Sequence, residues 1–142
     1  MSNCVLAIDG PAGVGKSSLA HALALHLGFQ LVDTGALYRL VAWQALKKGT
    51  ALDDTASLAA IATGLSVGFR ATDIGNEVLL DGQDVNAHLR TEAVSDAASK
   101  VSAIPAVRAA LLDLQRHKAA AGGVVMEGRD IGTHACPAAE LK

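Results

Sequence analysis

Aromatic residues and basic clusters are scarce in this chain of 142 residues, which contains one Trp, one Tyr and two Phe. Ala, Leu and Val supply most of the apolar residues, which suits a close-packed core with many helices. The 12 Lys and Arg residues against 14 Asp and Glu residues give a net charge of −2, and only Lys47 and Lys48 are adjacent basic residues. This pattern gives no electrostatic reason to expect a nucleic-acid partner and favours a small anionic ligand.

Cysteines and long apolar runs are also scarce. Cys4 in an apolar run and Cys136 near the end are typical of reduced intracellular thiols and not of a disulfide framework. No run of 18 apolar residues occurs, and the N-terminus lacks a basic region. The five histidines have no paired spacing typical of a metal site. We therefore expect one cytoplasmic domain that binds neither nucleic acid nor membrane.

The clearest motif is a glycine-rich segment that lies between an apolar run at residues 4–8 and a helical pattern of leucines. It reads Gly10, Pro11, Ala12, Gly13, Val14, Gly15, Lys16, Ser17 and then Ser18. Glycines let backbone N–H groups surround phosphate oxygens, Lys16 carries positive charge toward the β- and γ-phosphates, and the Ser17 hydroxyl is placed to bind magnesium. The alternative, a chance glycine turn before an ordinary helix, is disfavoured because both spacing and context match. The sequence thus predicts a nucleoside-triphosphate site.

The periodicity predicts an α/β fold. Helices are expected at residues 16–27, 36–48, 91–101 and 105–121, with a short one that Asp53 or Asp54 caps and that ends near Gly64. Buried strands are expected at residues 4–8, 29–32 and 124–126. Short strands at residues 65–70, 77–80 and 83–85, with a hairpin turn at residues 81–82, indicate a small antiparallel insertion in a parallel-sheet protein. Ligands bind at the carboxyl edge of such a parallel sheet, so residues 10–17, 33–35 and 129–130 should face one crevice.

Three segments together resemble the bacterial cytidylate kinase family, namely residues 8–18, residues 32–39 (Val-Asp-Thr-Gly-Ala-Leu-Tyr-Arg) and residues 127–133 (Glu-Gly-Arg-Asp-Ile-Gly-Thr). The likeness extends to the antiparallel insertion and to the helices around residues 97–108. It implies a P-loop core with helices on both faces of a parallel sheet, and a monophosphate-binding insertion at about residues 65–102. It also implies phosphoryl transfer from ATP to CMP or dCMP, giving the diphosphate and ADP, with Mg²⁺.

The resemblance also implies which residues read the base. Cytosine presents an amino donor and two acceptors, N3 and O2. Asp130 can accept from the amine, and Arg108 and Ser99 can donate to the acceptors. Uracil would set a carbonyl against the Asp130 carboxylate, and a mismatch of buried polar groups is costly.

By the same resemblance, Arg39 and Arg129 clamp the monophosphate and act with Lys16 in catalysis. A guanidinium suits this task because its donors form a fixed fork. Without the surrounding motif, Arg39 would be interpreted as a solvated residue that extends over the helix surface.

Thr34, Tyr38 and Asp33 belong to the same motif. The Thr34 hydroxyl is expected to contact the acceptor nucleotide. Tyr38 either contacts the nucleotide or packs the helix. Asp33 either assists magnesium through water or only caps the following helix, and the sequence does not decide between these roles.

The family continues beyond the segment around Thr133 into a further strand, an arginine-bearing lid and closing helices, whereas no arginine follows Arg129 here. We therefore expect a C-terminally truncated chain, either a monomeric fragment or one paired with a chain that supplies the missing half. Three candidate parallel strands would leave one sheet edge open. The alternatives are a nucleotide-binding fragment without turnover and a kinase for another monophosphate. A GTPase-type switch is disfavoured because neither Asp-x-x-Gly nor Asn-Lys-x-Asp occurs.

Overall fold

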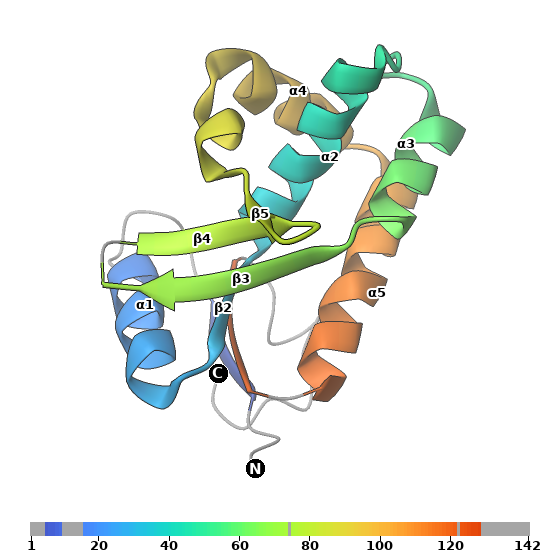
Figure 1. Cartoon of the computed structure of the whole chain (residues 1–142). Helices are drawn as coiled ribbons and strands as arrows, with labels where there is room; N and C mark the ends of the chain where they lie inside the picture. Colours follow the sequence, from blue (N-terminus) through green and yellow to red (C-terminus); the bar gives the residue numbers. More distant parts are fainter. Residues whose placement is uncertain (1–4, 10–15, 74, 122, 129–142) are drawn as a thin grey trace.

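The computed structural model describes residues 5–9, 16–73, 75–121 and 123–128. Its strands are β1 (Val5–Asp9), β2 (Gln30–Asp33), β3 (Val67–Thr72), β4 (Gly75–Leu80), β5 (Gln83–Asp84) and β6 (Val124–Gly128). Its helices are α1 (Lys16–Leu27), α2 (Thr34–Lys48), α3 (Thr55–Thr63), the 3₁₀ helix η1 (Asn86–Arg90), α4 (Glu92–Val101) and α5 (Pro105–Ala121) (Figure 1). None of these described helices is long and apolar enough to span a bilayer.

The parallel sheet has the strand order β1–β6–β2, with helices on both faces. Successive side chains of a strand point to opposite faces. Leu31 and Val125 accordingly pack with Ala24 of α1. Val32 and Met126 instead belong to the larger core that includes α2, α3, α4 and α5. The expected three parallel strands are therefore confirmed, and no strand of the described residues pairs with the second edge of β1.

The antiparallel sheet β3–β4–β5 lies beside β2 and α1 and is joined to them by polar contacts (Figure 1). Gln30 Oε1 accepts a hydrogen bond from the Phe69 N–H at 3.3 Å, and Asn76 Nδ2 donates to the Leu31 carbonyl at 3.0 Å. On α1, the His21 ring nitrogen Nε2 lies 2.8 Å from the Thr72 carbonyl oxygen. The insertion is thus fixed to the parallel sheet.

The sequence predicts the limits of the helices better than those of the strands. α1 and α5 have the expected bounds, and Asp54 caps α3 through a 3.2 Å bond from the Ser57 N–H. In the hairpin turn, Asp81 and Gly82 both have positive φ, 53° and 85°. That conformation is typical of a type I′ hairpin.

Several expected boundaries are wrong by one or two residues. β3 begins at Val67 because the Leu65 N–H still bonds the Ala62 carbonyl in the turn after α3. β4 begins at Gly75 because the hairpin register extends to that residue. β2 begins and ends one residue later than expected, and α2 begins at Thr34 because Asp33 caps it. The sequence missed η1 entirely.

Gly49 ends α2 in the left-handed conformation, with φ 69°. We expect Gly49→Ala to lower the free energy of unfolding by about 1–2 kcal/mol, because an L-residue is strained there. A Cβ at Gly49 would meet nothing within 4 Å, so the cost is conformational. Gly64→Ala is the matched control, since Gly64 ends α3 with φ −88°. Urea denaturation measures the free energy of unfolding of both variants. Equal losses of stability in the two variants would contradict the left-handed strain assigned to position 49.

Candidate active site

The three parallel strands end together at one edge of the sheet. Asp9 of β1 pairs with Gly128 of β6, and Asp33 of β2 pairs with Glu127. α2 follows β2 without a gap, and α1 begins at Lys16, after the glycine-rich segment. Since ligands bind at the carboxyl edge of an open parallel sheet, a ligand-binding site is expected at this edge.

Part of the predicted site lies outside the described residues. These residues are Gly10, Pro11, Ala12, Gly13, Val14, Gly15, Arg129 and Asp130. Lys16, Ser17 and Ser18 are described only as the first residues of α1. Their contacts with ATP, magnesium and CMP stay predictions.

Asp33 caps α2. Its Oδ1 accepts hydrogen bonds from the N–H groups of Gly35, at 3.0 Å, and of Ala36, at 3.4 Å. These donors have no partner within the helix, so the cap satisfies them. The capping role that the sequence left open is confirmed, while the magnesium role stays a prediction.

The Arg39 side chain reaches back toward the start of α2. A Cβ atom on Gly35 would lie 3.6 Å from Arg39 Nη1 and 3.3 Å from Asp33 Oδ1. Glycine at position 35 therefore leaves room for the guanidinium beside the capped helix end. Arg39 is exposed, so its charge is available to a ligand.

A cavity of about 390 Å³ opens beside this helix start. The residues that line it are Asp33, Ala36, Arg39, Asn86, Leu89, Arg90 and Ser95. They come from the end of β2, from α2, from η1 and from α4, and most of them are polar. The volume lies within the range of small-molecule sites. The structure thus brings the predicted residues Asp33 and Arg39 together at one cavity.

Sequence reasoning missed the other polar residues of this cavity. Asn86 and Arg90 belong to η1, a 3₁₀ helix of five residues that is too short to show helical periodicity. Ser95 lies on α4, one turn before the predicted Ser99. The one sequence signal that could have indicated a helical turn here was the spacing of the apolar residues Val85 and Leu89, which are four residues apart and both buried.

Four other predicted residues, Thr34, Tyr38, Ser99 and Arg108, are described by the structure and do not line the cavity. The Arg108 guanidinium on α5 interacts with the Tyr38 hydroxyl on α2. The Ser99 hydroxyl donates to the Ser95 carbonyl oxygen at 3.3 Å within α4. Thr34 is half-buried as the first residue of α2. Whether these groups contact a nucleotide stays a prediction.

The donor set at this edge fits an indirect magnesium site rather than a cage of protein ligands. Within the described residues, no three His, Cys, Asp or Glu side chains gather around one point. Asp33 Oδ1 serves the helix cap, which leaves the second carboxylate oxygen for a metal-bound water. Mg²⁺ typically keeps several waters and takes few protein ligands.

A three-stranded parallel sheet with helices on both faces, a small antiparallel sheet and a glycine-rich segment between β1 and α1 define a P-loop α/β fold of the nucleoside monophosphate kinase type. A sequence model of the family described as cytidylate kinase matches residues 6–142. The chain belongs to the cytidylate kinase family.

Curated relatives agree with this assignment. The chain is 51% identical over 139 residues to a cytidylate kinase of Symbiobacterium thermophilum, covering 97% of the chain and 62% of the relative. It is 52% identical over 138 residues to one of Pelotomaculum thermopropionicum, covering 96% and 61%. The corresponding protein of Pasteurella multocida is 46% identical over 143 residues, covering 100% and 63%. The chain thus spans about three fifths of the length of these relatives.

Burial raises the pKa of Tyr38 above its ordinary value of 10.0, and the Arg108 charge and hydrogen bond oppose this shift more weakly. The unfolded chain therefore releases this proton first, so the free energy of unfolding falls as the pH rises from 10.0 toward the folded-state pKa. Tyr38 is the single tyrosine, so phenolate absorbance reports it alone. We expect a midpoint above 10.0 in the folded chain.

Arg108→Gln tests the cause of this shift. Loss of the neighbouring positive charge should move the midpoint still higher. Arg70→Gln, which removes an arginine that pairs with Glu77, is the control and should leave the midpoint unchanged. A midpoint that falls in Arg108→Gln would contradict the contact.

Proposed function

We propose that the chain contributes to a kinase that transfers the γ-phosphoryl group of ATP to CMP or dCMP, giving CDP or dCDP and ADP. The observation that carries this proposal is the arginine-containing cavity at the carboxyl edge of the parallel sheet, in a chain with a P-loop sequence. The names of the relatives support the substrate class.

In the proposed reaction, an oxygen of the acceptor phosphate attacks the γ-phosphorus, the bond to the β–γ bridging oxygen breaks, and ADP leaves. Residues 10–18 bind the ATP phosphates, and Lys16 stabilises charge on the transferred group. Arg39 and Arg129 bind the acceptor phosphate. Ser17 directly, and Asp33 through water, would hold Mg²⁺, which would supply positive charge to the triphosphate. No covalent phosphoenzyme is expected.

Base recognition is proposed for Asp130, Arg108 and Ser99, as described for cytosine above. The Tyr38–Arg108 contact supports a further role, because the hydroxyl of Tyr38 holds the guanidinium in place before the base arrives. A pre-positioned donor loses less conformational entropy on binding. Ser99 lies within residues 65–102, the proposed monophosphate-binding insertion, and Arg108 follows it closely in the sequence. The setting is proposed to be the cytoplasm, where free nucleotides are the partners.

A second candidate is a nucleotide-binding unit that does not turn over by itself. It is favoured by the share of the relatives' length that the chain spans, which is 62% of the Symbiobacterium thermophilum protein. Phosphoryl transfer depends on cations placed around the transferred group. In this case a partner chain would supply them, or the chain would bind CMP as a monomer without reaction.

The test is CMP-dependent release of ADP by the purified chain with ATP and Mg²⁺. We expect Lys16→Ala to lower kcat by about 100-fold or more, since one electrostatic stabiliser of the transition state is lost. Lys48→Ala, at the exposed end of α2, is the matched control and should retain activity. UMP in place of CMP measures base discrimination.

Each outcome separates the candidates. ADP release that Lys16→Ala leaves unchanged would contradict the proposed P-loop role. CMP binding without any ADP release would favour the second candidate. Equal rates with UMP and CMP would contradict the proposed base recognition.

A further inference from the structure

The cavity has a second wall that the proposed roles leave unused. α2 supplies Arg39 to the first wall, whereas η1 supplies Asn86, Leu89 and Arg90. η1 follows the antiparallel sheet in the chain and packs against both α2 and α4. Two arginines from different elements thus face one small cavity.

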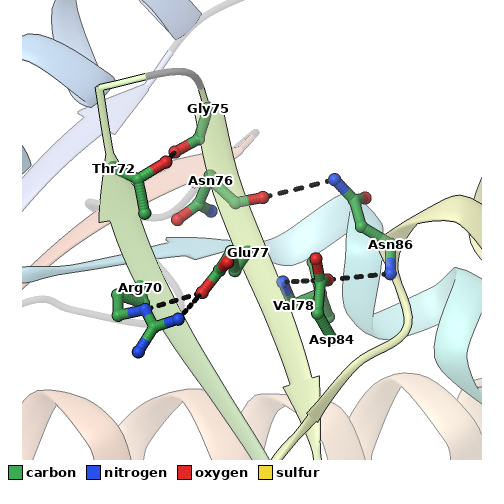
Figure 2. A network of polar contacts seen from close by, with 8 residues as sticks. All are labelled: Arg70, Thr72, Gly75, Asn76, Glu77, Val78, Asp84 and Asn86. Atoms are coloured by element: carbon green, nitrogen blue, oxygen red, sulfur yellow. Dashed lines mark hydrogen bonds and ion pairs between the residues drawn. The ribbon is translucent and has the colours of Figure 1, made fainter.

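η1 is fixed to the antiparallel sheet by its first residue. The Asn86 Nδ2 group donates to the Asn76 carbonyl oxygen at 3.3 Å, and the Asn86 N–H donates to Asp84 Oδ1 at 3.0 Å (Figure 2). The same Asp84 oxygen accepts from the Val78 N–H at 3.3 Å. Asp84 therefore joins the start of η1 to β4.

The other face of η1 is fixed to α2. Leu89 is only 2% exposed and belongs to the main core. The His88 ring stacks on Trp43 of α2 with centroids 4.9 Å apart and an interplanar angle of 13°. A short 3₁₀ helix held on both sides in this way presents its last residue, Arg90, from a fixed backbone.

Arg39 and Arg90 carry the positive charge at this cavity. In the part of the chain that the structure describes, neither Arg39 nor Arg90 forms an ion pair, and both side chains are exposed. Among the described residues, Asp33 is the one carboxylate that lines the cavity, and its Oδ1 is used by the helix cap. Two guanidinium groups at a polar cavity give it a positive potential, which favours an anionic ligand.

We propose that Arg90 binds the phosphate of the acceptor nucleotide together with Arg39, and that Asn86 is a positioning residue that holds η1 in place for it. A guanidinium suits this ligand because its donors match two phosphate oxygens at once. The inference rests on the proposed function for the identity of the nucleotide. Arg90 would thus be a phosphate-binding residue on η1, in addition to those proposed on the P-loop and on α2.

The test compares the binding of CMP with that of cytidine, which lacks the phosphate, by calorimetry on the 142-residue chain. We expect Arg90→Gln to weaken CMP binding by about 10- to 100-fold, the range for loss of a charge-assisted hydrogen bond, and to leave cytidine binding unchanged. Arg90→Lys should give an intermediate loss because it keeps the charge without the fork. Arg70→Gln, outside the cavity, is the matched control and should change neither affinity.

Three results would overturn the inference. Equal losses for CMP and cytidine would assign Arg90 to the nucleoside or to folding, and circular dichroism of the variant distinguishes these two causes. CMP binding that falls in Arg39→Gln but not in Arg90→Gln would reject Arg90 and leave the proposed function standing. An unmodified chain that binds no CMP would reject both the inference about Arg90 and the proposed function. CMP binding without turnover would instead reject kinase activity alone.

Discussion

The cap that Asp33 places on α2 is the contact on which the site depends. β2 ends at Asp33 and α2 begins at the next residue, so the carboxylate joins the edge of the parallel sheet to the helix start. The Asp33 carboxylate accepts hydrogen bonds from two backbone N–H groups that have no partner within the helix. This fixes the first turn of α2 and, with it, the place of Arg39 beside Gly35. A helix that began elsewhere would carry Arg39 away from the cavity.

The second wall of the cavity depends on a different set of contacts. Asn76 donates to the Leu31 carbonyl on β2 and accepts from Asn86 at the start of η1. One residue of β4 therefore connects the parallel sheet with the 3₁₀ helix that carries Arg90. The cavity is thus assembled from segments that lie far apart in the sequence, around residues 33–39 and 86–95, and that the two sheets hold together.

The sequence predicts the features that arise from local chemistry. The bounds of α1 and α5 and the cap at Asp54 follow from periodicity and capping residues. The carboxyl-edge site follows from the order of strands and helices. The individual roles of the nucleotide-binding residues come from the family resemblance and stay predictions.

The features that the sequence did not predict are tertiary. η1 is too short to show a periodic pattern in the sequence. It is held in place by contacts with distant residues such as Asn76 and Trp43. The contact between Tyr38 and Arg108 likewise joins helices that lie 70 residues apart. The limits of β3 and β4 were wrong by two residues because hairpin register, and not side-chain type, decides where their pairing begins.

The central claim is that the cavity between α2, η1 and α4 binds the acceptor nucleotide. The most direct measurement is a titration of the chain with CMP, followed by amide chemical shifts in NMR spectra. The account predicts that the largest shifts fall on both walls of the cavity, at Ala36 and Arg39 and at Asn86, Arg90 and Ser95. Shifts confined to other parts of the chain, with both walls unchanged at saturation, would contradict it.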